Sequence, residues 1–315
     1  MQGLLQGNNN RAILHSKKSQ GFLKFLYILP FMIILGVFAY YPLYGWVYAF
    51  FDYMPPIPLK KSPFVGLFWF QDMVANKVKV SQLLQVIKNT FGMSGLNILF
   101  SWLPMAFAIF LNEIRSTRYR KLIQTVTTLP NFISWVLAYS LAFALFSSEG
   151  MANSLIKSMG LTGGPVLWLQ SSDHVWVTMW AWYTWKALGW SAIMYIAAIT
   201  GIDDALFEAA KVDGASRMQV IWHITVPCLL PTYFVLLMLQ IAGFLNNGME
   251  QYYVFQNAFN KDTIQVLDLY VYNLAVGGGS YSVSVAISML KSVISVVLLF
   301  SVNTLSKWVR GESIV

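Results

Sequence analysis

Six long apolar segments limit what this chain can fold into. About twenty mainly apolar residues in helical form cross the hydrocarbon layer of a bilayer. A backbone surrounded by lipid must satisfy its own hydrogen bonds, which favours helices. The sequence therefore predicts an all-α membrane protein with six transmembrane helices. The six segments are residues 23–51, 90–111, 122–146, 175–200, 228–244 and 283–305.

The composition agrees with this class. Of 315 residues, 57% are hydrophobic and 11% are charged, whereas soluble domains carry about 25% charged residues. The net charge of +8 comes from basic residues beside the apolar segments, as in the cytoplasmic flanks of membrane proteins. No nucleic-acid-binding motif accompanies them. We therefore expect the lipid bilayer as a partner and no nucleic acid.

Basic residues also predict the orientation in the membrane. The densest cluster of Lys and Arg, residues 115–121, follows the second apolar segment and indicates a cytoplasmic loop. This placement puts both termini in the cytoplasm. We expect a cytoplasmic arm at residues 1–22 and a single transmembrane domain at residues 23–315. No small-residue cleavage site follows the first segment, so we expect it to remain as a span.

A polar insert at residues 201–227 separates the fourth and fifth segments. Two aspartates can cap a helix over residues 205–212, which are strong helix formers. Gly214 suits the left-handed turn that ends such a helix. Ser216 and Gln219 have capping-box spacing and predict a second helix. The expected insert is thus a helix, a glycine turn and a second helix.

The insert has a surface that another protein could contact. Ala209 and Ala210 would leave a low-profile face, Gly214 allows a sharp bend, and Glu208 offers a carboxylate near the turn. The alternative is a well-capped cytoplasmic loop that only joins two spans.

The insert also carries a family pattern. Glu-Ala-Ala, three residues, Gly, nine residues and Ile, with Pro three positions later, resembles the signature of permease subunits of bacterial ATP-binding-cassette importers. Val226 departs from the pattern, since the family more often has Leu there. The six segments, the place of the insert and the chain length also match, so the resemblance covers nearly the whole chain. The matching residues are Glu208, Ala209, Ala210, Gly214, Ile224 and Pro227.

The resemblance implies a type I importer permease fold located in the bacterial cytoplasmic membrane. The matched residues would form coupling helices that rest in a groove of an ATPase subunit. The implied partners are a second homologous permease, two ATP-binding-cassette ATPases and an extracellular substrate-binding protein. ATP and Mg would be bound by the ATPases, and this chain would hold no cofactor, metal or catalytic residue. In keeping with this, the chain has no Gly-Lys dipeptide and therefore no Walker A loop.

Two segments resemble the carbohydrate branch of the family. Residues 129–135 and 244–251 are similar to maltose-type permeases, and closer still to Gram-positive permeases for oligosaccharides such as aldouronates. The resemblance implies a transmembrane subunit of an ATP-driven importer that translocates an oligosaccharide by alternating access.

The fourth segment offers candidate substrate contacts. Tyr183, Lys186 and Trp190 have the spacing of one helix face. A Lys within a span is costly unless it faces a cavity or a partner. Aromatic rings beside a donor suit a sugar, which has apolar patches and many hydroxyls. The alternative is an interfacial aromatic belt in which the Lys reaches to the membrane surface.

The fifth segment offers amides. Gln240, Gly243 and Asn247 would share a helix face, and amides both donate to and accept from hydroxyls. Interhelical hydrogen bonding is the alternative. Glu250 and Lys291 are further polar groups near the path. The resemblance places substrate contacts in these two spans, and Lys186 is added on physical grounds. The predicted path is Tyr183, Lys186, Trp190, Gln240 and Asn247.

Two other classes of function remain open. A membrane-embedded enzyme acting on a lipid-linked sugar would need clustered acids, histidines or metal ligands, but Glu250, Asp262 and Asp268 are dispersed and the three histidines lack metal-ligand spacing. An ion-coupled secondary transporter usually has internal repeats, and it would leave the polar insert unexplained.

Overall fold

The computed structural model describes residues 24–160 and 164–310, so the predicted arm at residues 1–22 lies outside the described residues. Within these ranges the chain is helical, with one isolated antiparallel bridge between Phe51 and Phe64. The elements after the first turns are η1 (Gly36–Tyr40), η2 (Tyr41–Phe50), η3 (Leu59–Lys61), α2 (Phe68–Ala75), α3 (Lys77–Leu99), α4 (Leu103–Asn112), α5 (Thr117–Thr128), η4 (Leu129–Phe132), α6 (Trp135–Phe146), α7 (Met151–Ser158), α8 (Val175–Thr200), α9 (Asp204–Val212), α10 (Arg217–Val220), η5 (Ile221–Thr225), α11 (Val226–Ala242), α12 (Glu250–Phe255), α13 (Lys261–Ile264), α14 (Leu267–Tyr272), η6 (Asn273–Gly277) and α15 (Tyr281–Arg310).

Five of the helices within the described ranges are long and apolar enough to cross a membrane. A sixth span is formed if α8 is counted with α9, which follows it at a bend of 70°. The all-α fold predicted from the apolar segments is confirmed, and the fourth segment matches the bounds of α8. The five helices are Lys24–Phe50, Lys77–Asn112, Trp135–Ser158, Arg217–Ala242 and Tyr281–Thr304.

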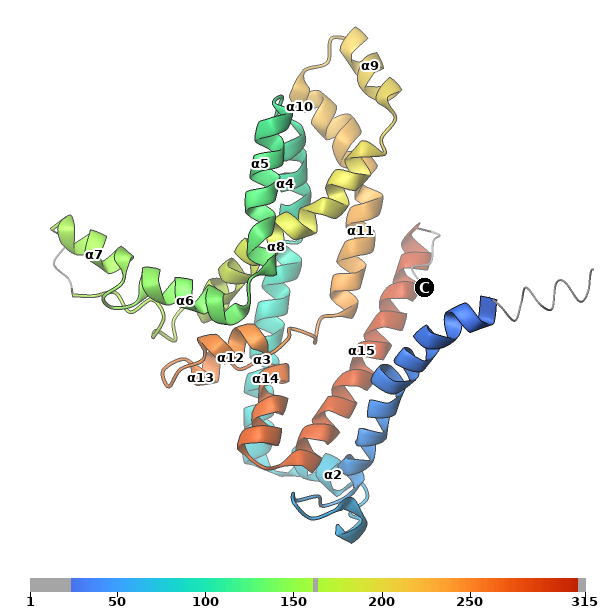
Figure 1. The fold of residues 1–315 in the computed structure, drawn as a ribbon, viewed down its shortest axis with the longest axis vertical. Coiled ribbons are helices and arrows are strands. Elements are labelled where there is room, and N and C mark those ends of the chain that lie inside the picture. Colours follow the sequence, from blue (N-terminus) through green and yellow to red (C-terminus); the bar gives the residue numbers. More distant parts are fainter. Residues whose placement is uncertain (1–23, 161–163, 311–315) are drawn as a thin grey trace, which may run out of the picture.

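The second span begins earlier than its apolar segment indicated. Asn76 accepts hydrogen bonds from the backbone N–H groups of Val78 and Lys79 and so starts α3 outside the apolar region. Polar and apolar residues alternate over the first turns of this helix. Hydropathy therefore detected only the later, apolar part of the helix Lys77–Asn112, in which α3 and α4 run as one column (Figure 1).

The predicted third span is wrong as a single helix. Pro130 lacks an N–H donor, and its ring clashes with the carbonyl four residues earlier, which breaks a helix. The hydroxyls of Thr127 and Thr128 bond back to carbonyls of α5, at 2.8 Å to Ile123 and 2.7 Å to Gln124. The 3-10 turn η4 follows, and α6 then leaves sharply to one side of the bundle (Figure 1).

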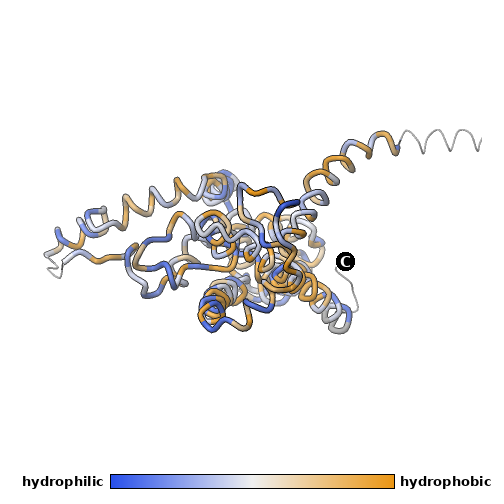
Figure 2. The backbone as a smooth tube through the Cα atoms, turned by 90° about the horizontal axis from the view of Figure 1, so that it is seen from below, coloured by the Kyte–Doolittle hydropathy of each residue, from blue (hydrophilic) through white to orange (hydrophobic). Residues whose placement is uncertain are grey.

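The buried core lies around α8. Near its start, Val175 and Met179 pack with Tyr252 and Phe255 of α12, and further along it packs on α4 and α11. A separate cluster joins α3, α14 and α15. The helix of Lys24–Phe50 has no buried residue in its apolar window. Its last part, η2, packs on α15, and the buried Ala49 belongs to the same cluster, whereas its first part extends away from the other helices with hydrophobic positions along it (Figure 2). That helix is suited to contact with lipid or with another subunit.

Candidate functional site

The polar insert forms the helix, glycine turn and helix that its sequence predicts. The Asp203 carboxylate accepts from the Ala205 N–H at 3.0 Å and starts α9. Gly214 has a φ of +73°, which an L side chain rarely adopts, and ends the turn. Ser216 and Gln219 then form both hydrogen bonds of a capping box at the start of α10. These local hydrogen bonds make the insert a self-supporting element.

The second helix of the insert does not end at Pro227. It continues from α10 through the π-helical turn η5 into α11, as a helix of 26 residues. Proline has no N–H to donate to the carbonyl four residues earlier, and the wider π turn just before Pro227 accommodates the missing donor. The second half of the insert is therefore continuous with the span as one helix. The half-buried Ile224 lies in η5, and Pro227 is exposed at the start of α11.

The insert leaves an apolar surface uncovered. Val212 is 88% exposed and Met218 is 61% exposed, at the two sides of the glycine turn. Glu208, Ala209 and Gly214 are also exposed, and Ala210 is half-buried. Arg217 of the insert reaches Glu113 at the end of α4, 3.9 Å between charged atoms. A cleft of about 360 Å³ is lined by Glu113, Asp204, Phe207, Glu208, Lys211, Ala215, Arg217 and Val220.

Three of the predicted path residues meet in one cleft. It lies where the end of α3 and the start of α4 face α8 and α11, and its volume is about 330 Å³. Tyr183 and Trp190 line it from α8, and Gln240 lines it from α11. Tyr183 is 43% exposed and Trp190 is 50% exposed. The cleft thus combines aromatic faces with an amide, which is a surface that can contact sugar rings and hydroxyls.

Lys186 points elsewhere. Its ammonium donates to the backbone carbonyl of Asn131 at 2.8 Å and lies 5.3 Å from the centre of the Trp135 ring. Trp190 makes an edge contact with Phe132. The segment at residues 129–135 is therefore a corner that is held on α8 by a cation and an aromatic ring.

The same corner rests on Gly189. A Cβ at this position would lie 2.3 Å from the Thr127 carbonyl oxygen and 2.7 Å from the Thr128 nitrogen. No real contact of this kind is so short, so only glycine permits α5 and α8 to cross here. The sequence offered no signal for this close approach, because a glycine within a span is common.

The predicted shared face of Gln240, Gly243 and Asn247 is wrong. Helix α11 ends at Ala242, with Gly243 as its C-cap, so Asn247 is no longer on the helix. The Asn247 amide instead donates to the Ser94 hydroxyl at 2.9 Å. That bond makes Asn247 part of a joint between α3 and the chain that follows α11.

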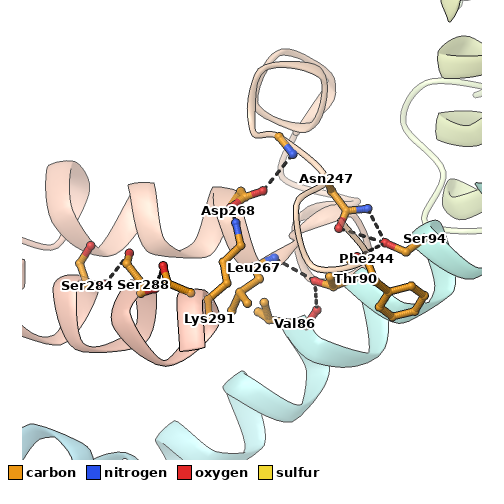
Figure 3. Close-up of polar contacts among 12 residues, drawn as sticks. Val86, Thr90, Ser94, Phe244, Asn247, Leu267, Asp268, Ser284, Ser288 and Lys291 are labelled. Atoms are coloured by element: carbon orange, nitrogen blue, oxygen red, sulfur yellow. Dashed lines mark hydrogen bonds and ion pairs between the residues drawn. The ribbon is translucent and has the colours of Figure 1, made fainter. Parts of the chain in front are cut away.

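A polar network around this joint was missed by sequence reasoning (Figure 3). Asp268 pairs with Lys291 of α15 and also accepts from the Gly248 N–H at 2.9 Å. The Thr90 hydroxyl accepts from the Leu267 N–H at 2.9 Å. The partners are far apart in the sequence, so spacing could not reveal them. Glu250, the other polar group considered near the path, is exposed at the start of α12.

A comparison with protein families identifies the kind of molecule. A family model described as binding-protein-dependent transport system inner membrane component matches residues 102–311. The chain belongs to this family. In the part of the chain that the structure describes, no three His, Cys, Asp or Glu side chains gather to hold a metal ion.

Curated relatives cover almost the whole permease. The chain is 36% identical over 288 residues to protein LplB of Bacillus subtilis (strain 168), with 90% of this chain and 89% of the relative covered. It is also 36% identical over 295 residues to the polygalacturonan/rhamnogalacturonan transport system permease protein YteP of the same organism, with 92% and 90% covered. These relatives and the family match confirm a multi-pass transport permease rather than an enzyme.

Solved structures agree in fold. A crystal structure of a bacterial ABC transporter involved in the import of the acidic polysaccharide alginate matches the permease with a TM-score of 0.83 and 31% identity, over 94% of this chain and 99% of that chain. A second structure, of bacterial alginate ABC transporter with an alginate pentasaccharide-bound periplasmic protein, matches at 0.83 and 30%, over 95% and 98%. The predicted type I importer permease fold and the resemblance to the carbohydrate branch are confirmed.

Proposed function

We propose that this permease is the transmembrane subunit of an ATP-driven importer that moves an oligosaccharide across the bacterial cytoplasmic membrane by alternating access. The observation that carries the proposal is the insert: a self-capped pair of helices with uncovered apolar side chains, continuous with the span of α11. Exposed apolar patches of this kind mark interaction sites. The sugar relatives support the substrate class.

The complex would contain a second homologous permease, two ATPases and an extracellular substrate-binding protein. ATP and Mg would be held by the ATPases, which would receive Glu208, Ala209, Ala210, Gly214, Ile224 and Pro227 of the insert (residues 201–227). Both termini and the insert would lie on the cytoplasmic side, as the basic cluster at residues 115–121 indicates. Rotation of the insert would then tilt α11 and open the path alternately to each side.

The proposed path runs through the cleft of Tyr183, Trp190 and Gln240. These three side chains would contact the sugar directly. Lys186 and Asn247 do not line this cleft and would support its walls from outside, since each is engaged with another element, the η4 corner and α3 respectively. A wall residue changes transport by moving its neighbours and not by touching substrate.

Charge reversal in the insert tests the coupling role. We expect Glu208→Lys and Gly214→Pro to abolish oligosaccharide uptake while ATPase activity of the assembled complex persists, because the insert no longer transmits closure. Uptake of labelled oligosaccharide and phosphate release are measured in the host membrane. Glu149→Lys, the same charge change at an exposed site outside the insert, serves as control. Normal uptake by both insert variants would refute the role, and uptake driven by an ion gradient without ATP would favour a secondary transporter.

Substitution in the cleft tests the path. Trp190→Ala combined with Asn247→Ala is expected to weaken transport several-fold while the complex stays assembled, since a stacking surface and a wall contact are lost. Gln240→Leu keeps the volume and removes only the amide. Uptake kinetics and size-exclusion chromatography separate the two effects. Unchanged kinetics in both variants would remove these residues from the path.

A further inference from the structure

A groove runs along the first turns of α3, at the end of the molecule opposite the insert. Its volume is about 490 Å³, and it is lined by one residue of α2 and by the first half of α3. Figure 1 shows α2 and the start of α3 at one end of the bundle and α9 at the other. This groove, here called the α3 groove, shares no lining residue with the cleft of Tyr183, Trp190 and Gln240.

The α3 groove combines apolar surface with positive charge. Its residues on α3 recur every three or four positions, so they share one face of the helix. Lys77 and Lys88 stand at the two ends of this row, and Leu84 lies between them. Leu84 is 59% exposed, and Val74, which lines the groove from α2, is 79% exposed. The members of the row are Lys77, Val80, Ser81, Leu84 and Lys88.

The protein supplies no negative charge to these two cations. None of the described residues that line the groove is acidic, and neither Lys77 nor Lys88 forms an ion pair within residues 24–160 and 164–310. Asp72 of α2 is already paired with Lys79. Helical side chains point toward the N-terminus and a lysine stem is flexible, so Lys88 can reach back toward Ser81. The groove is therefore suited to a ligand that carries an anionic group.

The length of the span places the groove at a membrane surface. The helix Lys77–Asn112 has 36 residues, which is about 54 Å at 1.5 Å per residue. A bilayer with its headgroups is only about 40–45 Å thick. The basic cluster at residues 115–121 marks the membrane surface at the far end of this helix. The excess length therefore lies at the groove, where α3 passes through the headgroup layer.

We propose that the α3 groove is a binding site for an anionic phospholipid. Lys77 and Lys88 attract the phosphate-bearing headgroup, the Ser81 hydroxyl donates to it, and Val74 and Leu84 pack against the glycerol and the adjoining acyl carbons. This ligand matches both parts of the groove. A soluble anion would leave the apolar surface uncovered, and an uncharged lipid would leave the lysines without a partner. The inference is independent of the substrate that is imported.

Photo-crosslinking identifies the molecule that lies in the groove. The whole transport complex, with p-benzoylphenylalanine in place of Val74, is placed in nanodiscs of equal parts phosphatidylcholine and phosphatidylglycerol, and the adducts are identified by mass spectrometry. We expect phosphatidylglycerol adducts to exceed phosphatidylcholine adducts about fivefold, which corresponds to about one lysine acting near an anionic surface. The same probe in place of Phe38, which is 77% exposed in the first span, should give the two lipids in nearly equal amounts.

Matched lysine variants locate the preference. In the same probe protein, Lys77→Gln/Lys88→Gln should bring the two lipids to nearly equal amounts, whereas Lys77→Arg/Lys88→Arg should retain the excess because the charge is kept. Lys60→Gln/Lys61→Gln, which changes exposed lysines outside the groove, should leave the excess unchanged. Equal amounts of the two lipids with the native lysines, or an unchanged excess in Lys77→Gln/Lys88→Gln, would overturn the proposal.

Two other occupants would give different results. An excess of inorganic phosphate, with ionic strength matched by sodium chloride in the control, should not reduce the phosphatidylglycerol adducts, because it lacks the apolar part that contacts Leu84. Displacement of the lipid by phosphate would identify a site for soluble anions and overturn the proposal. Adducts with the extracellular binding protein or with the second permease in place of lipid would identify a protein interface and overturn it equally.

Discussion

The two ends of the long helix Arg217–Ala242 are held in opposite ways. At the insert, the hydrogen bonds that define the shape join residues two to three positions apart, as between Ser216 and Gln219. At the other end, Asn247 bonds to a residue 153 positions away and Gly248 to one 20 positions away. The insert therefore keeps its own shape while its surroundings change, whereas the joint exists only when several helices are assembled. One end of α11 is suited to move and the other to stay.

The largest effect is expected at the ion pair of the joint. Lys291→Leu leaves the Asp268 carboxylate largely buried with the Gly248 N–H as its hydrogen-bond donor, and removing one member of a buried pair costs about 3–5 kcal/mol. Unfolding by denaturant in mixed micelles measures the loss. The side chains of Lys291 and Asp268 are 15% and 20% exposed.

A matched pair at the surface sharpens this prediction. Lys79→Leu removes the partner of Asp72, but Lys79 is 35% exposed, and exposed pairs contribute about 0–1 kcal/mol. The double variant Lys291→Leu/Asp268→Leu should recover most of the stability. Equal losses at Lys79 and Lys291 would contradict the view that the joint is the fixed end.

Close packing should give the next largest effect. Gly189→Ala forces a methyl against the Thr127 carbonyl, and overpacking of this kind costs about 1–3 kcal/mol. The thermal midpoint of the purified permease reports it. Gly95→Ala, at a helical glycine with open space around it, should be neutral or slightly stabilising. A tolerated Gly189→Ala would mean that α5 and α8 can separate freely.

The hydrogen bond between Ser94 and Asn247 should contribute less. Ser94→Ala removes one hydrogen bond of a half-buried amide, and such a bond contributes about 0.5–1.5 kcal/mol. Ser140→Ala removes an exposed hydroxyl that bonds only to its own helix and should have little effect. A double-mutant cycle with Asn247→Ala isolates the pair. Additive losses in that cycle would show that the bond does not hold the joint.

The smallest effect on global stability is expected at the insert. Gly214→Ala meets a φ of +73°, a conformation that costs an L residue about 1–2 kcal/mol. Because the insert is locally folded, hydrogen exchange of α9 should accelerate while the unfolding midpoint changes little. Gly201→Ala, where φ is −92°, is the control. A large drop in the midpoint for Gly214→Ala would show that the insert is not independent.

The insert was predictable because its signals are local. A cap, a helix-forming run, a glycine and a capping box each act within a few residues, and all four lie where the sequence placed them. The spans that are continuous and apolar, such as α8, were predictable for the same reason. The broken third span was not, because tolerance of proline depends on what packs beside it. Here α8 stabilises the break through Lys186 and Gly189.

The candidate path was predicted only in part. Tyr183 and Trp190 meet Gln240 in one cleft, as expected for aromatic and amide groups on facing helices. Asn247 lies elsewhere because α11 ends at Ala242 with Gly243 as its C-cap, and the prediction had counted that glycine as part of the shared helix face. The partners of Asn247 and Lys186 lie on other helices, so only the tertiary structure could show them.

By itself, the amino-acid sequence determined the class of protein, the helical content of its spans, the capped insert and the lack of a Walker A loop. These properties follow from hydropathy and from hydrogen bonds between near neighbours. The tertiary structure decided where spans break, which lysines are paired, and which side chains meet in the cleft of Tyr183, Trp190 and Gln240. Those outcomes depend on contacts between residues distant in the chain, where shape and burial decide which partners meet.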